Sequence, residues 1–242
     1  MKKLMIAAAA AVCGSVFALE SANVVGYQNV GFDKSGWMMN VGVQFSNIGA
    51  EGGAFTLDDS FFGNEAAEGD QVISMDADAW NLDTYDKLGK GLGWVLTPAN
   101  GGDSEALESI SASKGDMLYY IPAGASELTV AGEVAQGSQS VTFDTANEDG
   151  QWMFPLVNPF PIDTTWGDLN TFTKEGDQII SMDGDAWNLN TYDRLGDGLG
   201  WVLTPADGGD SESINSAETV IIPAGGAMYY IPTATTTWTV TL

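Results

Sequence analysis

Two residue types that support much of enzyme chemistry are absent or nearly absent from this chain of 242 residues. It contains no histidine, and its single cysteine is Cys13. Ser-His-Asp and Cys-His nucleophile activation, and zinc sites built on His or Cys, each require one of these side chains. Paired carboxylates could still serve a glycosidase, but carboxylates are so abundant here that pairs arise by chance. The sequence therefore predicts a non-enzymatic protein.

Basic residues are also scarce. The chain has 8 Lys and Arg against 33 Asp and Glu, for a formal net charge of −25. Such a chain repels phosphate backbones, because nucleic-acid binding relies on Lys and Arg to displace counterions. The sequence therefore predicts no nucleic-acid partner. The carboxylates have two interpretations: they keep an exported protein soluble, or some of them bind divalent cations.

Long hydrophobic runs are missing except near the N-terminus. Residues 1–18, MKKLMIAAAAAVCGSVFA, combine two lysines, an apolar run and small residues near the end. This is the pattern of a secretory signal peptide, and the apolar run is shorter than the roughly 20 residues that a transmembrane helix needs. Cleavage before Leu19 would also remove the only cysteine. We expect a secreted or cell-surface protein with no transmembrane span in the mature chain.

An internal duplication organises the rest of the chain. Residues 68–105 align without gaps on residues 175–212, and the two segments differ at six of 38 positions. The similarity continues in KGDMLYYIP at 114–122 and GGAMYYIP at 225–232. Such a repeat predicts two units of the same fold. The expected signal peptide, first β unit and second β unit are 1–18, 19–132 and 133–242.

The periodicity within each unit is that of β-strands. Apolar residues come in short runs rich in Val, Ile, Thr, Tyr and Trp, bounded by Gly, Asn and Asp. This pattern favours an all-β fold of two tandem sandwich-like or small-barrel units. Short helical turns are expected only within 106–114 and 164–171. The expected strands are 23–32, 36–46, 70–76, 79–86, 92–97, 116–122 and 127–134, then 139–144, 151–158, 177–183, 186–193, 199–204, 227–232 and 236–242.

One phrase stands in both copies, SMDADAWNLDTYD at 74–86 and SMDGDAWNLNTYD at 181–193. Its alternation and central aspartates predict a β-hairpin. The same carboxylates could instead hold calcium, which takes about six to eight oxygen ligands, with help from the repeated GGDSE turn. An EF-hand is excluded, because Trp80 stands where a third oxygen ligand belongs. The candidate calcium ligands are Asp76, Asp78, Asp86, Asp103, Glu105, Asp183, Asp185, Asp193, Asp210 and Glu212.

Carbohydrate binding is a third interpretation of the repeated phrase. Sugars are held by aromatic platforms flanked by Asp and Asn, and each unit carries such side chains. Neighbouring tyrosines on one strand face opposite sides, so one residue of each Tyr-Tyr pair points outward unless a second layer covers it. The candidate sugar-binding residues, one set in each unit, are Trp80, Tyr85, Tyr119, Trp187, Tyr192 and Tyr229.

The chain also resembles a known group of proteins. Its signal peptide is followed at once by SANVVGYQNV (21–30), then by GDQVISMD, a Trp-Tyr hairpin and a later Gly-Trp pair. These features resemble uncharacterised secreted β-repeat proteins of planctomycete and verrucomicrobial bacteria. The resemblance implies an exported or cell-surface β-protein and supplies no functional residues.

These observations lead to one main functional expectation. We expect an exported, non-enzymatic cell-surface or extracellular-matrix component, with calcium stabilisation left open as one of the interpretations of its acidic hairpins. The alternative is a carbohydrate-binding module with one aromatic site in each repeat. Self-association and surface glycans are the expected partners. Strand 236–242 is expected to offer a free edge for self-association, because unpaired strand edges attract further strands.

Overall fold

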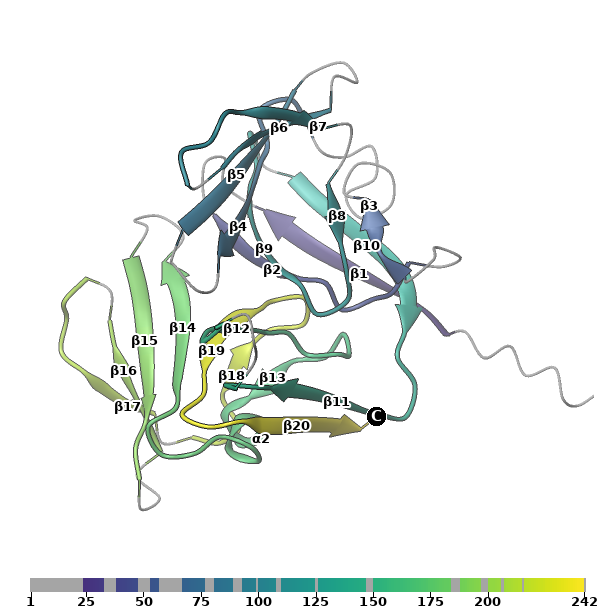
Figure 1. Cartoon of the computed structure of the whole chain (residues 1–242). Coiled ribbons are helices and arrows are strands. Elements are labelled where there is room, and N and C mark those ends of the chain that lie inside the picture. The colour runs from purple at the N-terminus through teal and green to yellow at the C-terminus, as the bar shows by residue number, and fades with distance from the viewer. Residues whose placement is uncertain are drawn as a thin grey trace, which may run out of the picture.

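A computed structural model shows two β-rich units, which occupy the upper and lower parts of Figure 1. The predicted all-β class and the duplication into two similar units are confirmed. The structure describes residues 24–32, 38–47, 53–56, 67–76, 81–88, 93–98, 100–107, 110–124, 126–146, 150–183, 188–196, 200–205, 207–214 and 216–241.

The first unit contains one large antiparallel sheet and two separate strand pairs. The large sheet has the order β2-β9-β4-β5-β6-β7, and the pairs are β1-β10 and β3-β8. The strand bounds are β1 Val24–Phe32, β2 Met39–Gly42, β3 Phe55–Thr56, β4 Gln71–Asp76, β5 Asn81–Lys87, β6 Trp94–Thr97, β7 Glu105–Leu107, β8 Ser111–Ala112, β9 Met117–Ile121 and β10 Ser126–Val134.

The second unit repeats this topology strand for strand. Its large sheet has the order β12-β19-β14-β15-β16-β17, and its pairs are β11-β20 and β13-β18. Its one described helix, α2, spans Trp166–Asn170. The strand bounds are β11 Ser138–Phe143, β12 Phe154–Leu156, β13 Thr164–Thr165, β14 Gln178–Asp183, β15 Asn188–Arg194, β16 Trp201–Thr204, β17 Glu212–Ile214, β18 Val220–Ile222, β19 Met228–Ile231 and β20 Thr236–Thr241.

The two predicted helical turns have different outcomes. The turn within 164–171 is confirmed as α2, whose start is fixed by a capping box: Thr165 accepts from the Asp168 amide, and Asp168 accepts from the Thr165 amide. The turn within 106–114 is wrong. There β7 and β8 pair with neighbouring strands instead, because Leu107 lies opposite Trp94 at the start of β6.

The seam between the units and the end of the chain are both set by strand pairing. β10 runs on to Val134, which lies opposite Val24, and β11 begins at Ser138. The expected boundary at 132/133 therefore falls inside β10. The terminal strand is not free on both sides, because β20 pairs with β11 over its whole length, from Thr236 opposite Phe143 to Thr241 opposite Ser138. Among the described residues no strand pairs with the other edge of β20, so one open edge remains there.

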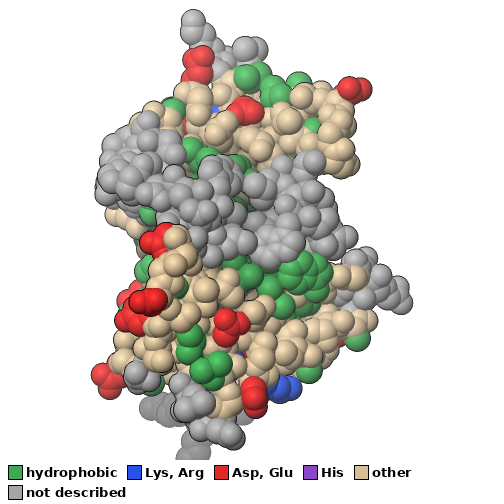
Figure 2. Space-filling view, turned by 90° about the vertical axis from the view of Figure 1, so that its left-hand side faces the viewer, with side chains coloured by type: hydrophobic (Ala, Val, Ile, Leu, Met, Phe, Trp, Pro, Cys, Tyr) green, Lys and Arg blue, Asp and Glu red, His purple; other side chains and the backbone are tan. Residues whose placement is uncertain are grey.

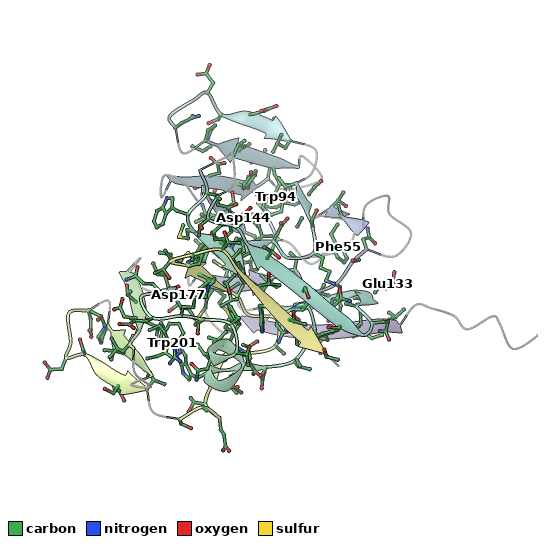
Figure 3. All side chains as sticks on the ribbon, turned by 60° about the horizontal axis from the view of Figure 1, so that its bottom comes forward. Phe55, Trp94, Glu133, Asp144, Asp177 and Trp201 are labelled. Atoms are coloured by element: carbon green, nitrogen blue, oxygen red, sulfur yellow. The ribbon has the colours of Figure 1, made fainter. Side chains whose placement is uncertain are left out.

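Each unit has its own apolar core on the inner face of its large sheet. Trp94 and Trp201, which are equivalent in the repeat, are both almost fully buried there. Figure 3 labels Trp94 with Phe55 in the first unit and Trp201 with Asp177 in the second. Phe160 crosses from the second unit into the core of the first. The cores are therefore not sealed off from each other.

A third apolar cluster lies between the units. It joins Ile73 of β4 and Tyr119 of β9 to Ile180 of β14 and Tyr229 of β19, and the rings of Tyr119 and Tyr229 lie 6.2 Å apart. These are pairs of equivalent positions, so this apolar cluster is close to two-fold symmetric in its residues. Met38 and Met153 form a further equivalent pair in the cluster.

The backbone also crosses the interface. The Gly42 amide donates to the Gly225 carbonyl at 2.8 Å, and Asn40 Nδ2 donates to the Ala227 carbonyl at 3.1 Å. A Cβ atom at Gly42 would lie only 2.8 Å from the Gly226 carbonyl oxygen, so the close approach requires glycine. The two outer faces of the large sheets thus cover each other.

Candidate functional site

The repeated phrase forms the predicted hairpin in both units. In the first copy β4 and β5 pair from Gln71 opposite Asp86 to Asp76 opposite Asn81. In the second copy β14 and β15 pair in the same register, from Gln178 opposite Asp193. The central turns, 77–80 and 184–187, lie outside the described residues, and with them Asp78, Trp80, Asp185 and Trp187.

The hairpin separates the carboxylates that were expected to share an ion. Asp76 is the last residue of β4, whereas Asp86 lies opposite the first residue of β4. Five residue steps along the strand separate these positions, which at about 3.3 Å a step places the two backbones roughly 16 Å apart. The same register separates Asp183 from Asp193. These pairs therefore cannot be neighbouring ligands of one ion.

Asp86 and Asp193 already have partners on the neighbouring strand. Gln71 Nε2 donates to Asp86 Oδ1 at 2.5 Å, and Gln178 Nε2 donates to Asp193 Oδ1 at 2.6 Å. Both bonds join residues that lie directly opposite each other. Cross-strand pairs of this kind stabilise a sheet, so these two carboxylates have a structural role in the hairpin.

The carboxylates of the GGDSE turns lie at the free edges of the two large sheets. Glu105 begins β7 and Glu212 begins β17, the last strand in the order of each sheet, and both are exposed, as are Asp103 and Asp210. Two inter-strand spacings, about 10 Å, separate β7 from β5. Within the described ranges, no three His, Cys, Asp or Glu side chains lie close enough to hold a metal ion. Charges at a free edge hinder edge-to-edge aggregation, which is a sufficient role for these side chains.

Two of the candidate sugar-binding residues are buried, which corrects that expectation. Tyr119 and Tyr229 are 0% and 2% exposed and lie in the interface between the units. They are the outward-facing members of the Tyr-Tyr pairs, and the other unit is the second layer that covers them. Burial raises the pKa of Tyr119 far above its ordinary value, with a smaller contribution from Tyr229. Neither ring can serve as a surface platform.

Tyr85 and Tyr192, the remaining described aromatic candidates, are half-buried. Each packs against the core of its own unit. Burial raises the pKa of both tyrosines, opposed by hydrogen bonds with Ser74 and Ser181 respectively. They anchor the hairpin to the core, so little of either ring remains for a ligand.

A buried carboxylate in each unit was not among the candidate residues. Asp177 is 1% exposed and accepts four hydrogen bonds: from the Tyr230 hydroxyl, from the amides of Lys174 and Thr233 at 2.7 and 2.8 Å, and from the Thr233 hydroxyl at 2.8 Å. Burial raises the pKa of Tyr230, and the hydrogen bond with Asp177 and the charge of that carboxylate raise it further. The carboxylate ties the turn before β14 to the turn after β19.

Asp70 ties the corresponding two turns together in the first unit. It is 2% exposed and accepts from the Tyr120 hydroxyl and from the amides of Ala67 and Ala123 at 2.6 and 2.7 Å. A buried carboxylate is costly unless hydrogen bonds replace its hydration. The sequence signal was the retention of both Gly-Asp-Gln and Tyr-Tyr-Ile-Pro in each copy, which a pairing between the two motifs explains.

Few cations balance the acidic surface. Figure 2 shows Asp and Glu side chains spread over the upper and lower parts of one face, with Lys and Arg visible at few places. Lys87 lies over the ring of Trp94 at 5.1 Å, and its equivalent Arg194 lies over the ring of Trp201 at 5.7 Å. These two cations are therefore engaged by the duplicated framework through cation–π contacts.

The paired strands β11 and β20 present a row of hydroxyl groups on their outer face. Ser140 contacts Thr239 at 2.9 Å, Thr142 contacts Thr237 at 3.1 Å and Thr241 donates to Ser138 at 3.2 Å. Opposite residues thus satisfy each other across the two strands.

Comparison with models of known protein families, with curated proteins and with solved structures found no match. The resemblance to exported bacterial β-repeat proteins therefore stays a prediction. Across the part of the chain that the structure describes, no helix has the length and apolar character needed to span a membrane.

Proposed function

We propose that the protein is an exported, non-enzymatic component of a cell surface or extracellular matrix, and that its two units act as one rigid block. One observation carries this proposal: most of the large side chains that are preserved in both copies and described by the structure are used inside it. Trp94 and Trp201 fill the cores, Tyr119 and Tyr229 join the units, and the Gly-Asp-Gln carboxylates fasten the turns. The side chains that both copies share therefore build the structural framework of the protein.

The interface supports the rigidity of the block. It combines a continuous apolar cluster with two hydrogen bonds to backbone carbonyls, and Phe160 enters the other unit's core. Domains joined by a loose linker move relative to each other unless their interface is large and apolar. Here the seam between Val134 and Ser138 is only three residues long, which further restricts the units.

The location can be tested by labelling intact producing cells with a membrane-impermeant, amine-reactive biotin reagent. Lys174 is exposed and offers a reactive amine. We expect biotinylated protein from intact cells or from the culture medium. Labelling that appears only after the cells are lysed would contradict an exported protein.

Calcium stabilisation is proposed only for the turns 77–80 and 184–187, because the described carboxylates do not converge. Calcium that binds the folded state alone would stabilise it by mass action. Thermal unfolding with calcium, with magnesium and with excess EDTA at matched ionic strength tests this. We expect a calcium-specific rise in Tm that Asp78→Ala with Asp185→Ala removes. Equal Tm values in all three conditions would make the phrase a purely structural hairpin.

Glycan binding is the weaker proposal, because Tyr119 and Tyr229 are buried and unavailable to a ligand. It now rests on Trp80 and Trp187, which lie outside the described residues. Glycan-array binding that disappears in a Trp80→Ala, Trp187→Ala double variant would favour it over a purely structural role. Array binding unchanged in that variant would remove these residues from consideration.

A further inference from the structure

A cavity of about 380 Å³ lies at the seam between the two units. One side is formed by Val43, Lys114 and Gly115 of the first unit, and the other by β11 with Val157 and Pro159 of the second. Pockets for small molecules combine an apolar lining with a few polar groups that fix orientation. This cavity has that composition, with valines on both sides and a single ammonium group.

Lys114 is the unusual member of this cavity. It is half-buried, and burial lowers its pKa. Within the described ranges its ammonium has one hydrogen-bond partner, Gln139 Oε1 at 3.3 Å, which is neutral. Although the chain has 33 acidic residues, none of the described ones pairs with this ammonium, so its charge is not compensated within the described residues. A ligand anion would compensate it.

Gln139 holds the lysine in place. Its Nε2 donates to the carbonyl oxygens of Gln136 at 2.9 Å and Ser138 at 3.3 Å, which leaves Oε1 directed to Lys114. The amide is therefore fixed by backbone groups and acts as a positioning residue for the ammonium.

The lysine does not belong to the duplicated framework. Alignment through the Tyr-Tyr-Ile-Pro motifs places Ala224 of the second unit at the position of Lys114. A long lysine side chain often serves only to cover apolar surface with its methylene groups. That role would be met equally well by methionine, which provides a test.

We propose that this cavity binds a small organic acid, with its carboxylate on the Lys114 ammonium and its body against Val141 and the accessible edge of Val157. The net charge of −25 repels anions from the protein as a whole, so an anion that binds must do so through a local cation. The carboxylate could belong to an aliphatic acid, which would use Val141, or to a sugar acid, which would use the exposed hydroxyl groups of Ser140 and Thr142.

Ligand-detected NMR titrations of the full chain with hexanoate and with glucuronate test the proposal. 1-Hexanol and glucose are the uncharged counterparts. We expect at least one acid to bind with a Kd near or below about 1 mM, and more tightly than its uncharged counterpart. Binding by hexanoate identifies an aliphatic ligand, and binding by glucuronate identifies a sugar acid.

Two charge-matched variants separate the site from the overall field. Lys114→Met should weaken binding at least about tenfold, because a charge-assisted hydrogen bond is lost while the apolar stem is kept. Lys174→Met removes the same charge from an exposed position and should leave the Kd unchanged. Unchanged Tm values show that both variants fold. The proposal is overturned if neither acid binds at about 10 mM, or if Lys114→Met binds as well as the parent protein.

Discussion

The two units share one topology but differ in how they satisfy their polar groups. Trp201 Nε1 donates to Asn170 Oδ1 at 3.1 Å, whereas Trp94 Nε1 is buried without a hydrogen-bond partner among the described residues. Asp177 accepts one more hydrogen bond than Asp70, because Thr233 stands where the first unit has Ala123. The strand framework therefore tolerates changes in the hydrogen bonds that support it.

Their outer ribbons differ as well. β11 and β20 present the hydroxyl row, while β1 at the equivalent place exposes 73% of Tyr27, which lies opposite Ala131. Surface positions of a duplicated unit can diverge freely, because they support neither a core nor the interface. The predictions below use pairs of equivalent residues to test which differences matter.

The largest effect is expected at the interface. Ile73→Asp and Ile180→Asp each place a charge in the apolar cluster and should lower the free energy of unfolding by about 4 kcal/mol or more. Because the positions are equivalent, the two losses should agree closely. Urea denaturation measures both losses. Val25 is exposed, so the control Val25→Asp should change the free energy of unfolding by no more than about 0.5 kcal/mol. Loss at only one position would break the symmetry of the interface.

The buried carboxylates come next. Asp177→Ala and Asp70→Ala each leave a tyrosine hydroxyl and two backbone amides without an acceptor, so each should cost about 3 to 5 kcal/mol. The loss at Asp177 should be larger by about 1 kcal/mol, because the Thr233 hydroxyl loses its acceptor too. Measuring both in a Thr233→Ala background should make the two losses equal. An unequal result there would assign the difference to another contact.

Adjacent tyrosines should respond in opposite directions. Tyr120→Phe removes a hydrogen bond to Asp70 and should cost about 1.5 to 3 kcal/mol. Tyr119→Phe removes a buried hydroxyl without a described partner and should raise the free energy of unfolding by about 1 kcal/mol. Urea denaturation of the two variants side by side measures the contrast. Destabilisation by Tyr119→Phe would reveal a partner for that hydroxyl.

The smallest effect concerns the two tryptophans. Asn170→Ala leaves the indole of Trp201 unpaired, as that of Trp94 is in the first unit, and should cost about 1 kcal/mol. Asn170 is exposed, so no cavity is created. In a protein that already carries Asn170→Ala, Trp201→Phe should add no further loss of hydrogen bonding. A double-mutant cycle of these two substitutions measures the coupling between the two side chains. A zero effect of Asn170→Ala would mean that water replaces the amide.

Much of the fold could be predicted from the sequence because strands and hairpins are local. The two-residue alternation around Gln71 and Asp86 specified a hairpin, and duplication guaranteed that the second copy would follow. Short strands such as β3 and β8 were missed, since two residues do not form a period. Their pairing depends on contacts between Phe55 and Ala112, two residues that are far apart in the sequence.

The candidate site was harder to predict because proximity in sequence misleads inside a hairpin. Asp76 and Asp86 are ten residues apart yet lie at opposite ends of paired strands. Alternation showed correctly that Tyr119 and Tyr120 face opposite sides, but only the packing of the second unit decides that Tyr119 is covered. Asp70 gave no sign of burial by itself, since aspartate before a strand is usually a solvated turn residue.

The apolar cluster of equivalent residues between the units carries an evolutionary consequence. A contact that matches Ile73 with Ile180 and Tyr119 with Tyr229 is self-complementary, which is the defining property of the interface in a symmetric homodimer. A gene encoding one unit would have specified a partner for its own product. Fusion of two copies turns that bimolecular encounter into an intramolecular one, which no longer depends on protein concentration. Each half can then mutate separately. Lys114 in the first unit and Ala224 at the equivalent position of the second are the kind of difference that only a fused pair can acquire.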